Sequence, residues 1–307
     1  MKVNGDHGQL IFLKIQNFTD FKMSMQVCCV DPQPQIYPPS DVDKMKAELV
    51  KIDNFMKEVK VGKATPETFQ GLEAAVKVID EIILSLDNSN DFVIIGGFNV
   101  IMPLLSCPDK EVVAATAELI ADLCQNHTYC QTKALEFNFL PELVKLLDSP
   151  VDSKVCSKAL YAVSCLCRNN EYSIMHLETI NITPTLMKIL QESDEKLRAK
   201  TAFFLSYLSN YDSFREAFYK ADIVGTLIKL LEREQDSSSE HLLAALRDQV
   251  FKHVQSRVQC ASREYNLKEI LLNKKNLYDS KSEFEEAKEH CDKLLALCFP
   301  EETSNAN

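Results

Sequence analysis

The feature that most constrains the fold is a repeat in the middle of the chain. Residues 138–148 read NFLPELVKLLD, and residues 181–191 carry the similar segment NITPTLMKILQ. The apolar end of this unit occurs four times, at Leu104, Leu146, Ile189 and Leu230. The steps between these positions are 42, 43 and 41 residues. A period of roughly 40 to 47 residues is typical of armadillo and HEAT arrays, so the sequence predicts an all-α solenoid.

A long helix is expected after the short polar break that follows each apolar end. The four expected helices cover residues 111–126, 153–169, 195–210 and 239–253. In the second of them, apolar residues recur at three- and four-residue spacing, which predicts one buried stripe. Four copies exceed the roughly three repeats that a solenoid needs to bury a continuous core.

The repeat divides the chain into a leader, an array and a tail. Residues 1–39 are expected to be a flexible leader, because four prolines in residues 31–39 forbid a helix. The armadillo-like domain is predicted over residues 40–299. Capping helices occupy residues 40–86, the repeats occupy about 91–254, and further capping helices occupy 255–299, with a polar tail at 300–307. The predicted fold is therefore a right-handed armadillo/HEAT-like solenoid of about four repeats with helical caps at both ends.

Local signals place the helix boundaries within this plan. Ser40 and Thr65 are expected N-caps, with Pro66 at the first position of the second helix. The Asp- and Asn-rich segment 86–92 is expected to separate two helices. The glycine pair Gly96 and Gly97, and later Gly225, are expected to permit the tight turn that enters a repeat. Ser282 and Glu285 are expected to form a capping box for the last helix.

Composition limits the kinds of binding partner and the cellular compartment that we expect for this chain. The net charge of −11 argues against nucleic acid, because Lys and Arg supply most of the affinity for phosphates, and it disfavours a membrane surface likewise. The 11 cysteines are an odd number, and many occupy apolar helical positions. They are therefore interpreted as reduced, buried thiols of a cytoplasmic protein. The start of the chain lacks the apolar run of a secretion signal.

A second stripe on the long helices gives the candidate binding residues. Applying the repeat step places polar and aromatic residues at equivalent positions of successive helices, where they form a ladder. In an armadillo-like stack the long helices line the concave side, so the ladder is the expected binding surface. Its members are Ala115, Glu118, Asp122 and Gln125, then Lys158, Tyr161, Cys165 and Arg168, then Lys200, Phe203, Tyr207 and Asn210. A fourth copy at His241, Ala244, Asp248 and Phe251 aligns less well.

Catalytic and metal sites have no support in the sequence. The six histidines are scattered, and none has a metal-ligand spacing with Cys or another His. Cys165 and Cys167 lack the two-residue spacer of a redox pair, and the glycine pair lacks the pattern of a phosphate loop. We therefore expect no enzyme activity, no cofactor and no metal.

Several segments resemble the armadillo-type nucleotide exchange factors of heat-shock protein 70. The similar segments are residues 86–92 (LDNSNDF), 158–168 (KALYAVSCLCR), 200–205 (KTAFFL) and 284–299 (FEEAKEHCDKLLALCF). Together they cover about residues 66–299 in one order. The leader before Ser40 does not match the starts usual in that family. Because secretion and retention signals are missing, the cytosolic branch fits better than the endoplasmic-reticulum branch.

The resemblance implies a function and a set of contact residues. Family members grip the ATPase domain of heat-shock protein 70 with the concave face, hold its cleft open, and so promote the release of ADP and of the client. No catalytic residue is required. Carried over to the ladder, the resemblance implies contacts by Lys158, Tyr161, Arg168, Lys200, Phe203 and Tyr207, with Glu118 and Asp122 as second choices.

Two alternatives remain open at this point. Tyr161, Phe203 and Cys165 are also explained if they merely fill the groove between neighbouring helices. The rival function is an armadillo-type adaptor that binds a peptide or a helical partner without exchange activity. In armadillo proteins an Asn ladder binds peptide backbones, and here Asp122, Cys165 and Tyr207 take its place, which weakens the adaptor hypothesis. The simplest assembly state is a monomer.

Overall fold

The computed structural model describes residues 38–148, 152–233, 238–279 and 284–300. The contacts separate residues 1–38 from residues 39–307, and the description below concerns the second unit. The predicted leader up to residue 37, Ser282 of the predicted capping box, Cys28, Cys29 and the tail from residue 301 lie outside the described residues.

All regular elements in the described part of the chain are helices. In chain order they are α1 (Asp41–Lys60), α2 (Pro66–Ile82), α3 (Leu86–Ile94), α4 (Gly97–Ile101), η1 (Met102–Ser106), α5 (Lys110–Cys124), α6 (Thr128–Glu136), α7 (Phe139–Asp148), α8 (Ser153–Cys167), α9 (Glu171–Ile180), α10 (Thr183–Glu192), α11 (Glu195–Leu208), α12 (Asp212–Lys220), α13 (Ile223–Leu231), α14 (Ser239–Phe251), α15 (Val254–Cys260), η2 (Arg263–Tyr265), α16 (Leu267–Tyr278) and α17 (Glu285–Cys298).

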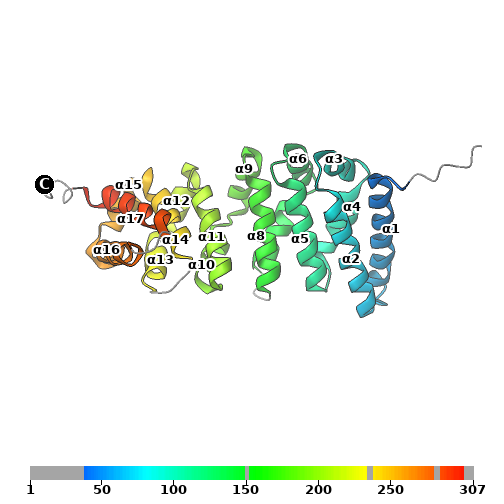
Figure 1. Cartoon of the computed structure of the whole chain (residues 1–307), viewed down its shortest axis with the longest axis horizontal. Coiled ribbons are helices and arrows are strands. Elements are labelled where there is room, and N and C mark those ends of the chain that lie inside the picture. The colour runs from blue at the N-terminus through cyan, green and yellow to red at the C-terminus, as the bar shows by residue number, and fades with distance from the viewer. Residues whose placement is uncertain (1–37, 149–151, 234–237, 280–283, 301–307) are drawn as a thin grey trace, which may run out of the picture. The chain divides into compact units, whose positions relative to one another are not determined.

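The long helices stack side by side, as Figure 1 shows for α2, α5, α8 and α11. Each long helix packs on the long helix of the next repeat, and the short helices α7, α10 and α13 each pack on the long helix that follows them in the chain. The stack extends beyond the four long helices expected from the repeat, because α2 packs on α5 and α17 packs on α14. This arrangement confirms the predicted all-α, armadillo-like solenoid.

Asparagine sets the C-terminal ends of two of the long helices, α5 and α8. Asn126 and Asn169 follow α5 and α8 with φ angles of 54° and 56°, in the left-handed region that few residues other than Gly, Asn and Asp adopt. Asn138 and Asn181 do the same within the repeated segments, at 58° and 55°. All four predicted long helices run two residues too far at their C-terminal ends, and for α5 and α8 the left-handed asparagine explains where the helix stops. Asn at these junctions explains how a chain with only seven glycines makes so many reversals.

Two predicted N-caps are confirmed. Ser40 forms a capping box with Asp43 at the start of α1, and Thr65 forms one with Thr68 ahead of Pro66 in α2. The segment 86–92 was wrongly placed between helices. Ser85 accepts a hydrogen bond from the backbone N–H of Asn88 and so caps α3, in which the Asp and Asn residues form the first turns.

The role predicted for Gly225 is also wrong, whereas the turn at Gly96 is confirmed. Gly96 has a φ of 86° and precedes α4. Gly225 instead lies inside α13, and the left-handed residue of that turn is Asp222, with a φ of 55°. The Asp222 carboxylate caps the backbone N–H of Gly225, and a Cβ on that glycine would lie 2.6 Å from Asp222 Oδ2. A side chain at position 225 would therefore displace the Asp222 carboxylate from this cap.

The core runs along the whole stack and includes nine cysteines. All nine are free and buried, as predicted: Cys107, Cys124, Cys130, Cys156, Cys165, Cys167, Cys260, Cys291 and Cys298. Within the ranges described, no single helix has the length and apolar character of a membrane span. Only the bent pair of residues 86–94 and 97–106, with an angle of 72° at its break, reaches that composition.

Candidate partner-binding surface

Eight ladder residues are the candidates for partner contact: Glu118, Asp122, Lys158, Tyr161, Arg168, Lys200, Phe203 and Tyr207. They lie on α5, on α8 and its C-cap, and on α11, and all but Lys200 contact another of the eight. On the α5 side, the ammonium of Lys158 pairs with the Glu118 carboxylate, and the hydroxyl of Tyr161 donates to Asp122 Oδ1 at 3.1 Å. Glu118 and Asp122 are one turn apart on the same helix face. The repeat step therefore correctly predicted which side chains, about 40 residues apart in the sequence, are neighbours in the structure.

On the α11 side, the ladder is held together by aromatic rings. The guanidinium of Arg168 lies 4.5 Å from the ring centre of Tyr207 and 5.3 Å from that of Phe203. The Tyr207 hydroxyl donates to the Cys167 carbonyl at 2.9 Å and accepts from the backbone N–H of Asn169 at 3.0 Å. Tyr207 thus fixes the end of α8, and Arg168 is held in one orientation by cation–π contacts.

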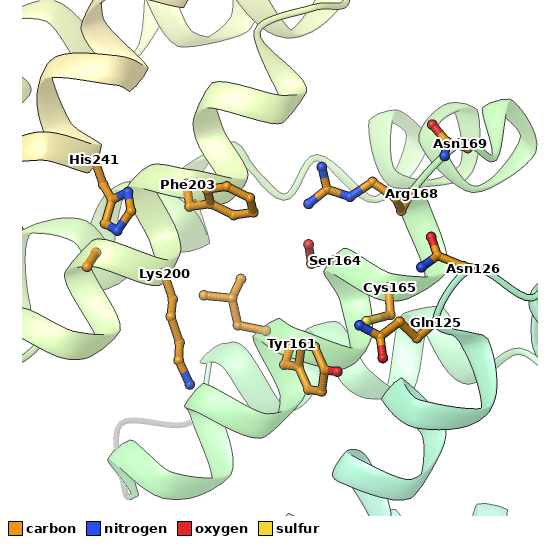
Figure 2. A pocket seen from close by; sticks show the side chains of 12 residues that line it. Gln125, Asn126, Tyr161, Ser164, Cys165, Arg168, Asn169, Lys200, Phe203 and His241 are labelled. Carbon is orange, nitrogen blue, oxygen red and sulfur yellow. The ribbon is translucent and has the colours of Figure 1, made fainter. Parts of the chain in front are cut away.

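A groove separates α8 from α11. These two helices pack less closely than α5 packs on α8, and the space between them has a volume of about 470 Å³. Tyr161, Arg168, Lys200 and Phe203 all line it, and Figure 2 shows their side chains around one opening. Lys200 Nζ donates to Ser157 Oγ at 2.6 Å. Phe203 remains 49% exposed, so it does not simply fill the space between helices.

The structure adds an acidic residue that the sequence analysis missed. Asp80 on α2 lies beside Asp122, and burial is the main cause that raises the pKa of Asp80 to about 7, followed by the charges of Asp122 and Glu118. Burial also raises the pKa of Asp122, against the effect of the hydrogen bond from Tyr161. Asp80 precedes Asp122 by 42 residues, so one more repeat step toward the N-terminus would have found it.

The less secure fourth copy of the ladder also reaches the groove. His241 on α14 lines it, with its ring edge-on to Phe203 at 6.1 Å between centroids. It follows Lys200 by 41 residues, which is the repeat step. The groove is therefore built from positions on three successive long helices, α8, α11 and α14, together with Gln125 and Asn126 at the end of α5.

Gln131 supports the surface from behind, and no sequence signal pointed to it. It lies on α6, is 2% exposed, and its Nε2 donates to the carbonyls of Cys165 at 2.9 Å and Arg168 at 3.0 Å. These carbonyls belong to the last turn of α8 and its C-cap, which have no partner within the helix. Gln131 therefore satisfies the end of α8 from which the Arg168 side chain projects.

Replacing Gln131 with alanine is expected to lower the free energy of unfolding by about 1 to 3 kcal/mol, because two buried carbonyls lose their donor. Urea unfolding followed by circular dichroism measures the change. The matched control is Gln125→Ala, since Gln125 is exposed on the groove side and its loss is expected to change stability by less than about 0.5 kcal/mol. Equal effects of the two variants would contradict the supporting role of Gln131.

Comparison with known proteins agrees with the fold and the family resemblance. Residues 88–208 match the family model described as the SIL1/FES1/HPBP1 C-terminal domain. Hsp70-binding protein 1 of Macaca fascicularis is 28% identical over 239 residues, which is 77% of this chain and 66% of that protein. The Hsp70 nucleotide exchange factor FES1 of Mycosarcoma maydis is 30% identical over 151 residues, which is 49% of this chain and 39% of that protein.

Solved structures agree on the fold alone. A designed armadillo repeat protein in complex with the peptide (KR)4 has a TM-score of 0.67 at 17% identity, covering 83% of this chain and 99% of that one. Another designed armadillo repeat protein has a TM-score of 0.66 at 18% identity. With the matched domain and the relatives above, the resemblance seen in the sequence is confirmed: residues 88–208 of this chain are similar to the C-terminal domain of the SIL1/FES1/HPBP1 family.

Proposed function

We propose that the chain is a co-chaperone that binds the ATPase domain of Hsp70 through the ladder and promotes the release of ADP and then of the client. The observation that carries the proposal is that the eight candidate residues lie on neighbouring long helices, where seven of them form three local contact groups and Lys200 lines the groove with Tyr161, Arg168 and Phe203. The names of the relatives, Hsp70-binding protein 1 and Hsp70 nucleotide exchange factor FES1, supply the partner.

The ladder has the composition of an energetically important interface. Aromatic and arginine anchors dominate binding energies in protein interfaces, and here Arg168 is already oriented by Phe203 and Tyr207. Lys200 adds a second positive charge at the groove. An interface whose side chains are ordered before binding loses less entropy when the partner arrives.

Exchange activity requires that this protein bind the open form of the ATPase domain more tightly than the closed form. A binding protein shifts the cleft of the ATPase domain toward its open form only if it binds that form more tightly. Moving the population from about 1% to about 99% open takes a preference of roughly 10⁴-fold. The ladder serves as a preformed surface that fits the open arrangement, so the reaction needs no catalytic residue, cofactor or metal of this chain. We place this activity in the cytoplasm and assign it to a monomer that binds neither nucleic acid nor membranes.

The direct test is the release of fluorescent ADP from an Hsp70 ATPase domain, with and without this protein. We expect acceleration by the native chain, and at least about 30-fold weaker binding to the ATPase domain for the double variant Lys200→Glu with Phe203→Ala. Tyr207 is left in place, because its hydroxyl bonds to the end of α8. Retained helical circular dichroism would show that the variant folds.

The matched control replaces an exposed lysine and an exposed aromatic residue elsewhere, Lys229→Glu with Tyr172→Ala. This control is expected to bind and accelerate as the native chain does. If the native chain binds no ATPase domain and leaves ADP release unchanged, the exchange-factor proposal fails and the adaptor function takes its place. If the native chain is active but the Lys200 and Phe203 variant is equally active, the ladder is the wrong surface.

A further inference from the structure

The groove between α8 and α11 is positively charged in a chain that is acidic as a whole. The chain has 45 Asp and Glu against 34 Lys and Arg, yet the residues that line the groove include Arg168 and Lys200 and no carboxylate. A second pocket, of about 230 Å³, shows the opposite pattern, with Asp148, Asp152 and Asp194 in its lining. The charge of the groove is therefore a local property of this surface.

Within the described residues, no carboxylate pairs with either of the two groove cations, Arg168 and Lys200. Lysines at the α5–α8 contact are paired, since Lys154 meets Glu111 and Lys158 meets Glu118. In the described part of the chain, by contrast, Arg168 and Lys200 form no ion pair. Arg168 is half-buried between aromatic rings, and a guanidinium held in this way favours a carboxylate in bidentate geometry.

Side-chain amides lie beside these cations. Gln125, Asn126 and Asn169 line the groove, and among the described residues none of their side chains has a hydrogen-bond partner. Asn126 and Asn169 occupy the same place in successive repeats, 43 residues apart, each just after the long helix ends. Figure 2 shows both near the rim on the same side as Arg168.

These amides discriminate between an extended and a helical occupant. A carboxamide donates and accepts hydrogen bonds, as a peptide group does. An extended segment presents free backbone N–H and C=O groups, whereas a helix has already satisfied its own. Amides next to uncompensated cations therefore match an extended backbone that carries acidic side chains.

We propose that this groove binds an extended acidic peptide segment of a protein partner, with Arg168 and Lys200 pairing its carboxylates and Asn126 and Asn169 bonding its backbone. This inference goes beyond the exchange activity, and its test requires no chaperone. The full chain is titrated against three fluorescent octapeptides of alternating residues: Asp with Glu, Lys with Arg, and Ser with Ala. Fluorescence anisotropy reports binding, at low and at moderate salt.

We expect the acidic peptide to bind and the other two to bind at least about 10-fold more weakly, with affinity falling as salt increases. Lys200→Glu and Arg168→Glu are each expected to weaken the acidic peptide by about 10-fold or more. Asn126→Gly with Asn169→Gly removes both amides but keeps a backbone that tolerates positive φ, and should also weaken it by about 10-fold. The matched control Lys229→Glu should change the affinity less than about 2-fold.

The proposal is overturned by any of three results. These are no binding of the acidic peptide at about 1 mM, equal binding of the basic peptide, and binding that the groove variants leave unchanged while their helical content stays native. Because the chaperone is absent, failure here leaves the exchange-factor proposal standing. Conversely, peptide binding without accelerated ADP release would support the groove and reject the exchange factor.

Discussion

Replacing Phe98 with alanine is expected to lower the free energy of unfolding by about 3 to 5 kcal/mol. Phe98 on α4 is fully buried. Its ring meets Phe92, Phe137 and Phe139 edge to face, with centroids 6.2, 5.7 and 5.0 Å apart. Because these rings come from α3, from the turn after α6 and from α7, the variant removes a contact between successive repeats. Urea unfolding followed at 222 nm gives the change.

The matched control is Phe251→Ala. Phe251 ends α14 and is 58% exposed, so its truncation is expected to cost less than about 0.5 kcal/mol. A similar loss in both variants would mean that ring size, rather than burial within the aromatic cluster, determines the effect. A loss below about 1 kcal/mol for Phe98→Ala would show that the cluster collapses around the missing ring.

The second prediction concerns pH and Asp80. The pKa of its carboxyl is raised from 3.8 to about 7, so the folded state holds this proton more tightly than the unfolded state. Stability therefore falls as pH rises from about 4 to about 7, and is level above that range. A shift of this size corresponds to about 4 kcal/mol at a dry site, and because Asp80 is half-buried, screening reduces the expected loss to about 2 kcal/mol.

Asp80→Asn is expected to remove most of this pH dependence and to stabilise the domain at pH 8, because a neutral amide can donate to Asp122 without repelling Glu118. Thermal unfolding between pH 4 and pH 8 measures both effects. Asp53→Asn serves as the control, since the hydrogen bond from Lys57 lowers the pKa of Asp53. The Asp53→Asn substitution should leave the pH dependence of stability between pH 4 and pH 8 as it is in the native protein. Identical pH dependence of stability in the native protein and in Asp80→Asn would rule out the raised pKa of Asp80.

The repeat predicted most of the fold because its period specifies which helices neighbour each other. The four long helices were found where expected, since their starts carry caps and their apolar stripes are strong. The predicted ends of α5 and α8 are too late because Asn126 and Asn169 are compatible with a helix in the sequence, while their left-handed φ angles stop the helix in the structure. The prediction for segment 86–92 was wrong for the opposite reason. Its Asp and Asn residues are typical of a loop, but Ser85 caps a helix that begins at Leu86.

The candidate surface was predictable where the repeat step applies. It related Glu118 and Asp122 to Lys158 and Tyr161, and their contacts are present. It would also have reached Asp80, had it been applied toward the N-terminus. Gln131 was beyond sequence reasoning, because its role depends on two carbonyls at the end of another helix. The cation–π clamp on Arg168 likewise exists only once α8 and α11 are packed.

The loose packing between α8 and α11 also bears on how the domain unfolds. In a linear array, the two sides of an interface melt together only when that interface couples them strongly. The long helices α8 and α11 contact each other less than the other neighbouring long helices do, and the hydroxyl of Tyr207 and the guanidinium of Arg168 are among the contacts between them. We therefore expect cooperativity to be weakest at this point, so that denaturant or tension separates the helices up to α8 from those that begin at α11 before either group loses its own structure.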